Sequence, residues 1–318
     1  MNHSALRRTL LRCVIALPLL PRVGLAQTVQ NSPLQQQINA QIAALETVSG
    51  GRIGFAVIDT ADGSQLGYRD DERFAFCSTA KVMAVAAILK QSMTRPALLQ
   101  QRMHFSAQQV TDSGYAPVTS KHLAKGMTIA ELCAAALTYS DNAAMNLLLD
   151  ALASPDQSGV QAVTAYARAI GDSTFRLDRT EPSLNTAIPG DPRDTSTPRA
   201  MALTLHRLVL GDVLAAPQRS QLLGWLKANT TGDKRIRAGV PAGWQVGDKT
   251  GTGAYGTTND LAILWPEARP ALILAIYYTQ TDPKAVARDE VVAATTRIVL
   301  RAFSASALMA QGHGASAS

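Results

Sequence analysis

The sequence is poor in cysteine, histidine and aromatic residues. It has three cysteines and five histidines among 318 residues, and 5% of its residues are aromatic. No two histidines are spaced as H-x-H or H-x-x-x-H, and no cysteine stands beside one, so the pattern does not predict a zinc site. Cys77 and Cys133, the two cysteines beyond the N-terminal region, can either pair or remain buried free thiols.

Long apolar runs are also missing. The run at residues 14–20 is too short to span a bilayer. It follows a basic start and precedes the small residues Gly24-Leu25-Ala26, which is the pattern of a cleavable export signal over residues 1–26. Because Arg7-Arg8 also fits a twin-arginine signal loosely, the general secretory route and the twin-arginine route both stay open.

The charge balance gives little reason to expect nucleic-acid binding. The chain has 30 basic and 24 acidic residues, a net charge of +6. Four of the basic residues and none of the acidic ones lie in residues 1–26, so the remainder has 26 basic and 24 acidic residues, a net charge of +2. The high isoelectric point therefore comes largely from the predicted signal.

Hydrophobic periodicity predicts strands toward both ends of the chain and helices between them. Alternating or β-branched runs indicate strands, and Asp62-Gly63 is a hairpin-turn signal between the first two. These strands are at residues 52–59, 65–69, 245–250, 259–265 and 271–279. Apolar residues at helical spacing predict helices at residues 33–48, 81–91, 129–137, 143–152, 159–170, 198–210 and 283–303.

These elements predict an α/β part combined with an all-α part. We expect an antiparallel five-stranded sheet flanked by terminal helices, with an all-helical subdomain inserted. Within one domain at residues 27–303, the α/β part takes about 27–76 and 229–303, and the all-α part takes about 77–228. The Ala-, Ser- and Gly-rich residues 304–318 predict a disordered tail. Ligands usually bind in the crevice between two such parts.

Ser78 and Lys81 lie three residues apart and would share one face of a helix near its start. A serine hydroxyl becomes a strong nucleophile when a nearby base takes its proton, and an amine of lowered pKa is one such base. By itself the pattern is weak, because an S-x-x-K match is expected about once in a chain of this length. An exposed helix serine beside a solvated lysine gives the same pattern.

Two further motifs also allow a structural and a chemical interpretation. Ser140-Asp141-Asn142 separates two predicted helices and fits a helix cap. It also fits a group of catalytic residues in which Ser140 transfers a proton and Asn142 binds a substrate carbonyl. Lys249-Thr250-Gly251, followed by Thr252, fits a hairpin strand, or a strand that binds an oxyanion and a carboxylate. The glycine favours the second interpretation, since glycine in a strand often marks close approach of another backbone segment.

The three motifs in this order resemble those of the penicillin-recognising serine enzymes. Their spacing resembles that of class A β-lactamases, with about 60 residues between the first two and a further hundred or so before the third. The segment from Arg179 to Asn185, which contains Glu181, resembles the E-x-x-L-N motif of that family's omega loop. Arg179 and Asp194 match the pair that closes the loop. The resemblance covers residues 30–303.

The resemblance implies a serine hydrolase that opens β-lactam rings. Ser78 would form an acyl-enzyme, Ser140 would pass a proton to the lactam nitrogen, and water activated by Glu181 would release the product. The first proton would go to Lys81 or, through a water, to Glu181, and both alternatives stay open. No metal or organic cofactor is implied.

The same resemblance implies a set of substrate-binding residues. The backbone N–H groups of Ser78 and Thr252 would form the oxyanion hole. Arg235 is one of three basic candidates in Lys234-Arg235-Ile236-Arg237, and Tyr115 fits an ordinary loop aromatic nearly as well as a residue at the cleft mouth. The full expected set is Asn142, Asn185, Lys249, Thr250, Gly251, Thr252, Tyr115 and Arg235.

The cysteines bear on the substrate range. Serine carbapenemases of class A resemble this chain around Cys77, but they bridge that cysteine to one just after the K-T-G segment, where this chain has Gly253. Other class A enzymes pair a cysteine at the Cys133 position with one in the first active-site helix, where this chain has Val85. The resemblance therefore implies two free buried thiols, good hydrolysis of penicillins and cephalosporins, and weak hydrolysis of carbapenems.

Two rival functions share part of the pattern. A D-alanyl-D-alanine peptidase shares the serine, lysine and lactam-binding motifs, but it needs no deacylating base such as Glu181 with Asn185. A β-lactam sensor stays acylated and is tethered by a membrane helix. We favour a periplasmic monomer that binds small β-lactams, with no nucleic-acid partner and no membrane insertion after signal cleavage.

Overall fold

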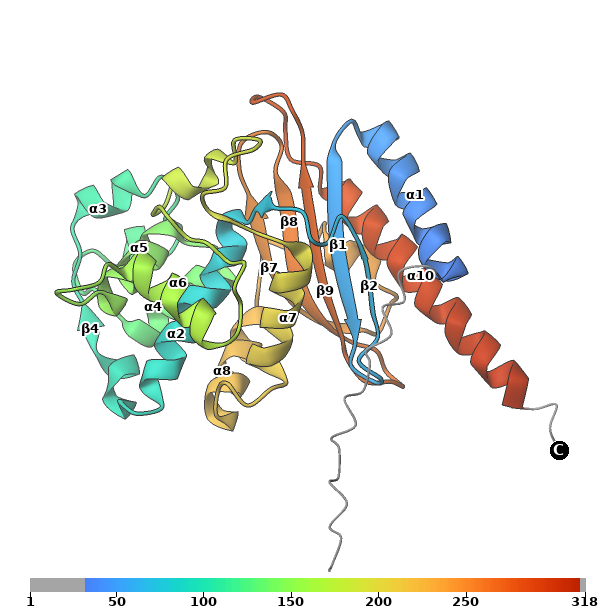
Figure 1. The fold of residues 1–318 in the computed structure, drawn as a ribbon. Coiled ribbons are helices and arrows are strands. Elements are labelled where there is room, and N and C mark those ends of the chain that lie inside the picture. Colours follow the sequence, from blue (N-terminus) through green and yellow to red (C-terminus); the bar gives the residue numbers. More distant parts are fainter. Residues whose placement is uncertain (1–31, 315–318) are drawn as a thin grey trace, which may run out of the picture.

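The computed structural model describes residues 32–314 and contains the predicted five-stranded antiparallel sheet (Figure 1). The strand order is β2-β1-β9-β8-β7, so strands from the two ends of the chain lie side by side. The strands are β1 (Arg52–Asp59), β2 (Gln65–Tyr68), β7 (Gln245–Thr252), β8 (Thr258–Trp265) and β9 (Leu272–Thr279). Nearly every residue of β1, β8 and β9 is buried, because helices cover both faces of the sheet.

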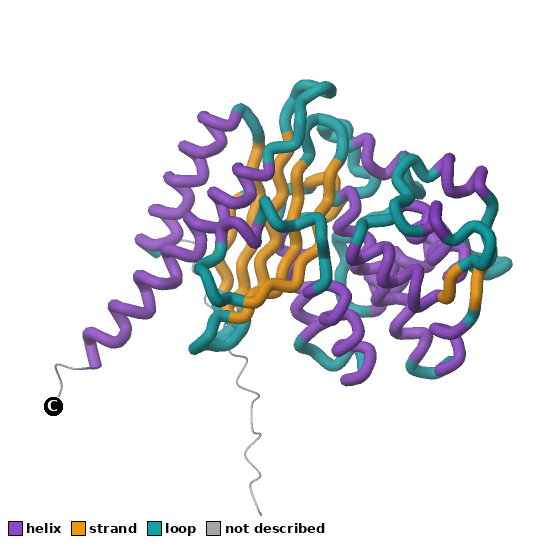
Figure 2. Tube along the Cα trace, turned by 180° about the vertical axis from the view of Figure 1, so that it is seen from behind, coloured by secondary structure: helices purple, strands orange, loops and turns teal. Residues whose placement is uncertain are grey.

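Two terminal helices cover one face of the sheet (Figures 1 and 2). The first is α1 (Pro33–Ser49), which begins where predicted because the Ser32 side chain accepts a hydrogen bond from the Gln35 backbone N–H at 3.1 Å. The second is α10 (Asp289–Gly314). The apolar residues of α1 and α10 that face the sheet pack against strand residues on that face and form one apolar core with them.

The limits of α10 correct two expectations. The helix begins at Asp289 rather than at residue 283, and Asp289 and Glu290 place acidic side chains in its first turn, where the helix dipole favours them. It continues to Gly314 rather than ending at residue 303, and the disordered tail expected over residues 304–318 stays a prediction. Alanine, leucine and methionine in this stretch are strong helix formers. Residues 315–318 and the expected signal at 1–26 lie outside the described residues.

The inserted helices form the second part of the molecule, on the other side of the sheet (Figure 1). At its centre lies α2 (Lys81–Ser92), whose residues Lys81–Leu89 are all buried, and which contacts α4, α5, α6 and α8. The other helices of this part are α3 (Ala107–Asp112), α4 (Ile129–Thr138), α5 (Asn142–Leu152), α6 (Gly159–Ala169) and α8 (Ala216–Lys227). Short 3₁₀ helices connect them: η2 (Pro96–Gln100), η3 (Thr119–Lys121) and η4 (Ser183–Thr186).

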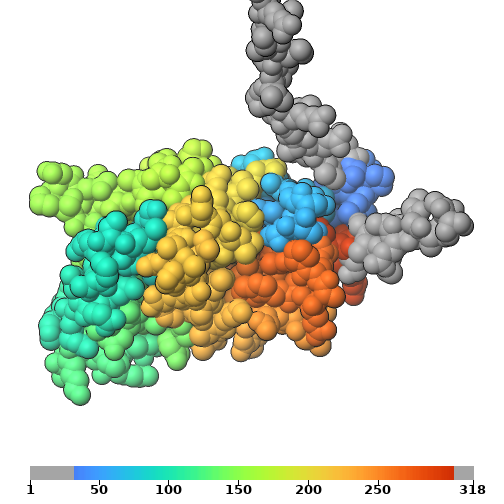
Figure 3. Space-filling view, turned by 90° about the horizontal axis from the view of Figure 1, so that it is seen from below, coloured from blue at the N-terminus to red at the C-terminus, as the bar shows by residue number. Residues whose placement is uncertain are grey.

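One predicted helix of the inserted part packs against the sheet as well as against another helix. Helix α7 (Pro198–Val209) packs on β1 and β9 and fills the space between the two parts (Figure 3). The remaining elements are the short helix α9 (Ile236–Gly239) and two small ladders, β3 (Phe74–Ala75) with β6 (Thr195–Ser196) and β4 (Arg102–Met103) with β5 (Met127–Thr128). Within residues 32–314, no helix has the length and apolar character that a membrane span requires.

Candidate active site

Ser78 and Lys81 lie together at the junction of the two parts. The 3₁₀ helix η1 (Cys77–Ala80) runs directly into α2, and this turn brings the side chains three residues apart onto one side. The Lys81 Nζ atom donates a hydrogen bond to Ser78 Oγ at 2.8 Å. Lys81 is completely buried, and Ser78 is only 7% exposed. The alternative of an exposed serine with a solvated lysine is therefore wrong.

The Lys81 amine is surrounded by three acceptors from two other segments. It lies 2.8 Å from the Ser140 carbonyl oxygen, 2.7 Å from Asn142 Oδ1 and 2.9 Å from Glu181 Oε1. Burial lowers the pKa of Lys81 because removing the cation from water is costly, and the nearby negative charge of Glu181 partly opposes this effect. The amine therefore holds its proton less tightly than a lysine in water.

The second motif serves both as a helix cap and as part of the site. Asp141 caps α5, because its Oδ1 accepts from the Ala144 backbone N–H at 2.8 Å. Its Oδ2 also accepts from the backbone N–H of Thr119 at 2.9 Å, which ties the cap to η3. Asn142 is the first residue of α5, and its Nδ2 donates to the Ser113 carbonyl at 3.0 Å. The cap thus orients Ser140 and Asn142 toward Lys81.

The third motif brings a second buried amine to Ser140. Lys249 lies on β7, and its Nζ donates to Ser140 Oγ at 2.9 Å and to the Thr250 carbonyl at 2.8 Å. Lys249 is completely buried, so desolvation lowers its pKa well below the ordinary value, and the nearby Lys81 adds to the shift. Ser140 Oγ also lies 3.4 Å from Lys81 Nζ, which places this hydroxyl between two amines.

Glu181 reaches the same cluster from the loop between α6 and α7. Its Oε1 accepts a hydrogen bond from Ser78 Oγ at 3.2 Å, and its Oε2 accepts from Asn185 Nδ2. The Glu181 side chain is completely buried. The peptide bond between Glu181 and Pro182 is cis, as the sequence allows.

Asn146 also holds Glu181 in place, and the motifs did not reveal it. Its Oδ1 accepts from the Glu181 backbone N–H, and its Nδ2 donates to the Glu181 carbonyl, both at 2.9 Å. Asn146 lies four residues after Asn142 on α5, so the two share a helix face. That spacing is the signal that could have identified it.

An ion pair closes the loop that carries Glu181. Arg179 Nε lies 2.5 Å from Asp194 Oδ2, and Asp194 is completely buried. Asp194 Oδ1 accepts from the backbone N–H groups of Asp178 and Arg179 at 2.8 and 3.0 Å. The Asp194 carbonyl also accepts from the Phe76 N–H at 3.1 Å, so the closure is joined to the segment just before Ser78.

Gly251 permits β7 to lie against η1, as the sequence pattern predicts. A Cβ atom at this position would lie 2.6 Å from the Phe76 carbonyl oxygen and 3.2 Å from the Thr79 nitrogen, closer than a side chain tolerates. The end of β7 and the turn that carries Ser78 are thereby held in backbone contact. This arrangement places the strand that ends at Thr252 beside the serine.

The two remaining candidates for substrate binding, Arg235 and Tyr115, differ in their exposure to solvent. Arg235 is buried, and its guanidinium donates to Thr252 Oγ1 at 2.7 Å, to the Gly251 carbonyl at 2.9 Å and to Asp289 Oδ1 at 2.7 Å. It therefore holds the end of β7 and orients the Thr252 hydroxyl. Tyr115 is 52% exposed, and its carbonyl accepts from the Asn142 N–H at 2.8 Å, so it lies next to the cluster with its ring partly in solvent.

Comparison with known proteins identifies the family. The model of the β-lactamase enzyme family matches residues 33–304. The chain is 58% identical over 272 residues to β-lactamase CTX-M-8 of Citrobacter amalonaticus, which covers 85% of this chain and 91% of that protein. It is 53% identical over 303 residues to β-lactamase Toho-1 of Escherichia coli, covering 95% of this chain and all of that protein.

Solved structures agree with these relatives. A β-lactamase from Desulfarculus baarsii has a TM-score of 0.81 and 51% identity, over 85% of this chain and 98% of that one. The class A β-lactamase described as the last common ancestor of Gram-negative bacteria has a TM-score of 0.78 and 55% identity, over 84% and 99%. The chain belongs to the class A β-lactamases. It is therefore a β-lactam hydrolase, an activity that confers antibiotic resistance.

Both cysteines of this β-lactamase outside residues 1–31 are free and buried, as expected. A Cβ atom built at Gly253 would lie 2.7 Å from Cys77 Sγ, so the glycine stands where a bridging cysteine would have to be. Thr231 was not among the expected site residues, although its Oγ1 lies 2.5 Å from Thr250 Oγ1. Among the described residues, no three His, Cys, Asp or Glu side chains are grouped so as to hold a metal ion.

Proposed function

We propose that this β-lactamase hydrolyses penicillins and cephalosporins through an acyl-enzyme on Ser78, which water activated by Glu181 then releases. One observation carries the proposal: Ser78 Oγ lies 2.8 Å from Lys81 Nζ and 3.2 Å from Glu181 Oε1 in a buried cluster. A hydroxyl becomes nucleophilic when a base within hydrogen-bond reach takes its proton. Two such bases are present.

In acylation, Ser78 Oγ forms a bond to the lactam carbonyl carbon and loses its proton to Lys81 or to Glu181. The oxyanion is stabilised by the backbone N–H groups of Ser78 and Thr252. The C–N bond of the ring then breaks, and the nitrogen takes the proton of Ser140 Oγ. The amine of Lys249 or Lys81 returns a proton to Ser140, since both lie within 3.4 Å of its oxygen.

The residues of β7 bind the carboxylate that penicillins and cephalosporins carry. Lys249 supplies charge, and the hydroxyls of Thr250 and Thr252 supply hydrogen bonds. Arg235 contributes through Thr252, whose hydroxyl it holds at 2.7 Å. Asn142 and Asn185 hold the remainder of the substrate beside Ser78, with Tyr115 at the mouth of the cleft.

In deacylation, Glu181 takes a proton from a water molecule, whose oxygen forms a bond to the ester carbon. The bond between that carbon and Ser78 Oγ then breaks, and Oγ takes back a proton from Glu181 or Lys81, which both lie within hydrogen-bond distance. Asn185 Nδ2 binds Glu181 Oε2, and Asn185 Oδ1 has no hydrogen-bond partner within the part of the chain that the structure describes. That oxygen can accept a hydrogen bond from the attacking water. Asn146 and the Arg179–Asp194 pair keep Glu181 in position.

A steady-state assay with a chromogenic cephalosporin tests the proposal. Continuous turnover supports it, and a burst of one equivalent without turnover would instead indicate a peptidase-like or sensor-like protein. Ser78→Ala should abolish turnover, while Ser64→Ala, at the half-buried residue just before β2, should leave it unchanged. Turnover by Ser78→Ala at the parent rate would exclude Ser78 as the nucleophile.

We also propose that the protein works as a periplasmic monomer after cleavage of residues 1–26. The support is the sequence pattern of residues 1–26. Cell fractionation with N-terminal sequencing tests the location and the cleavage site, and light scattering tests the monomer. A cytoplasmic protein with an intact N-terminus, or a stable dimer, would contradict the corresponding part.

A further inference from the structure

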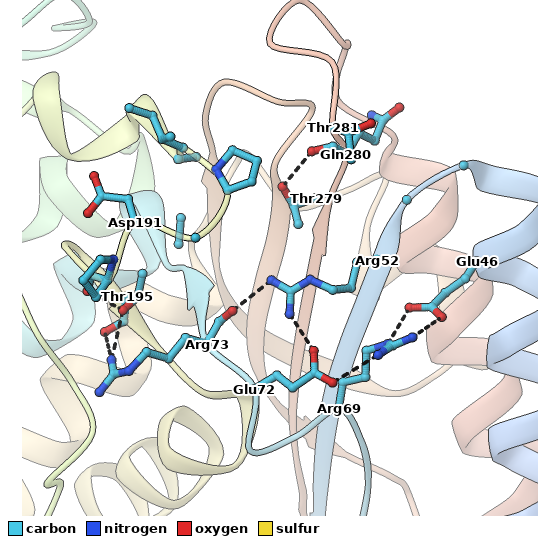
Figure 4. A pocket seen from close by; sticks show the side chains of 18 of the residues that line it. Glu46, Arg52, Arg69, Glu72, Arg73, Asp191, Thr195, Thr279, Gln280 and Thr281 are labelled. Atoms are coloured by element: carbon cyan, nitrogen blue, oxygen red, sulfur yellow. Dashed lines mark hydrogen bonds and ion pairs between the residues drawn. The ribbon is translucent and has the colours of Figure 1, made fainter.

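A second groove, separate from the cluster around Ser78, opens beside the loop that carries Glu181 (Figure 4). It encloses about 830 Å³, which is in the range of small-molecule sites. Its walls are the end of α1, the start of β1, the segment from Arg69 to Ala75, residues 187–192 and the end of β9. None of Ser78, Lys81, Ser140, Glu181 or Lys249 lines it.

Most charges in this groove neutralise one another. Arg52 lies 2.8 Å from Glu72, and Arg69 lies 2.9 Å from Glu46 and 3.0 Å from Glu72 (Figure 4). Two arginines thus balance two glutamates on one wall. On the other wall, Asp191 accepts hydrogen bonds from Arg193 on both carboxylate oxygens, and these bonds lower the pKa of Asp191 to about 2.

Arg73 is the exception. Its Nη1 donates to Thr195 Oγ1 at 2.9 Å, which fixes the guanidinium against β6. Within residues 32–314, Arg73 has no carboxylate within ion-pair distance, although Arg52, Arg69 and Arg193 each have at least one. The groove therefore carries one positive charge that no acidic side chain compensates.

Apolar surface lies beside this charge. The wall formed by the loop consists of Ala187, Ile188, Pro189, Gly190 and Pro192, and the side chain of Ile188 is exposed. Small-molecule sites combine mostly apolar walls with a few fixed polar groups that orient the ligand. A single uncompensated guanidinium next to an apolar wall favours a small organic anion with an apolar body, because carboxylates bind guanidinium groups through charge-assisted hydrogen bonds.

The groove is joined to the active site through Ala187. This residue lines the groove, and its Cβ lies 3.4 Å from the position that a Cβ of Gly253 would take. The chain just before Ala187 is also held to the strand end, since the Asn185 carbonyl accepts from the Ala254 N–H at 3.0 Å. A displacement of residues 187–192 therefore acts on Asn185 and on the residues after Thr252.

We propose that this groove is a second binding site, that it takes small monocarboxylates with an apolar body, and that its occupant changes the turnover of β-lactams by moving residues 187–192. The site rests on the geometry of the groove and not on the proposed catalytic mechanism. An experiment that disproves binding in the groove therefore leaves the proposed mechanism intact, and the reverse also holds.

Amide chemical shifts of the ¹⁵N-labelled protein, titrated with 2-naphthoate, test the site. We expect saturable shifts at Gly190, Thr279 and Gln280 with a dissociation constant of about 1 mM. Arg73→Gln keeps a donor for Thr195 but removes the charge, and it should weaken binding about tenfold or more. The matched variant Arg95→Gln, at an exposed arginine of the helical part, should bind as the parent does. Shifts confined to Ser140 and Thr250, or equal affinity in Arg73→Gln, would overturn the site.

Turnover of a chromogenic cephalosporin, measured with and without saturating 2-naphthoate, tests the coupling. We expect the rate to change by about twofold or more in the parent and in Arg95→Gln, and to stay constant in Arg73→Gln at the same concentration. Because a carboxylate can also compete at Lys249, the change must appear in kcat, which competition leaves unaltered. A purely competitive effect would overturn the coupling, even if the shifts support the site.

Discussion

Lys81 Nζ and Glu181 Oε1 lie 2.9 Å apart, and both side chains are completely removed from solvent. Removing one partner of a buried ion pair typically costs about 3–5 kcal/mol when the other charge stays buried. Here Lys81 can become neutral instead of remaining an unpaired buried charge, because its lowered pKa makes loss of the proton easier. The stability of the fold, the proton transfers and the position of Ser78 thus all depend on this pair. Substitutions of either residue have testable consequences.

We expect Glu181→Gln to trap a penicillin as an adduct on Ser78. The amide keeps the shape of the side chain but cannot take a proton from water, and loss of a general base typically lowers the rate by about 10²–10⁴-fold. Intact-mass spectrometry should detect the adduct. Glu267→Gln, at an exposed carboxylate in the loop between β8 and β9, serves as the control. Turnover by Glu181→Gln at the parent rate would show that Glu181 has another role.

The pH dependence of acylation distinguishes the two candidate bases. If Lys81 is the base, the acylation rate follows its neutral fraction, which grows as the pH rises through its lowered pKa. The charge of Glu181 raises that pKa, so Glu181→Gln should shift the rise to lower pH. Stopped-flow acylation rates of parent and variant measure the shift. If acylation by Glu181→Gln is lost at every pH, the base is Glu181.

Arg179→Ser should loosen the loop and displace Glu181. The Arg179–Asp194 contact involves a fully buried carboxylate, so its loss leaves that charge without its partner. We expect kcat for penicillins to fall by about tenfold or more, with bulkier cephalosporins admitted better than before. Arg193→Ser removes the neighbouring pair with Asp191, whose arginine is 47% exposed, and should have little effect. Equal kinetics in both variants would count against the closing role of Arg179.

Asn146→Ala should slow deacylation more than acylation. Asn146 holds the backbone of Glu181 through two hydrogen bonds of 2.9 Å, and it has no such contact with Ser78. We expect roughly a tenfold loss of kcat and a visible burst of acyl-enzyme. Thermal unfolding should confirm that the variant is folded. A variant that loses acylation and deacylation equally would show that Asn146 supports the site as a whole.

Thiol titration of the denatured, unreduced mature protein should find two free groups. Cys77 and Cys133 are free in the structure, and burial raises the pKa of both thiols. Since no bridge joins Cys77 to position 253, we expect weak hydrolysis of carbapenems beside good hydrolysis of penicillins and cephalosporins. Finding no free thiol would contradict the first statement. Efficient imipenem turnover would contradict the second, even with both thiols free.

The sequence by itself determined the sheet, seven of the helices and the four motifs around Ser78, because these depend on local patterns, whereas it did not predict α3, α8 or α9. Strand alternation, helical spacing and the Ser32 cap involve residues close together in the chain. One family has segments that resemble S-x-x-K, S-D-N, K-T-G and E-x-x-L-N. This resemblance led us to predict that residues far apart in the chain form one active site. Local patterns were less reliable at the C-terminal helix, where strong helix formers outweighed the small residues of the tail.

Tertiary structure alone decided which groups meet across long stretches of chain. Ser78 and Glu181 are 103 residues apart and Ser140 and Lys249 are 109 apart, so no local pattern fixes these contacts. Packing of the helices against the sheet also assigned Asn146 to Glu181, Thr231 to Thr250 and Arg235 to Thr252. The groove beside Arg73 depends on the same packing, because its walls come from both ends of the chain and from the loop between them. Burial then set the chemistry, since the lowered pKa of Lys81 and Lys249 follows from their removal from water and not from their place in the sequence.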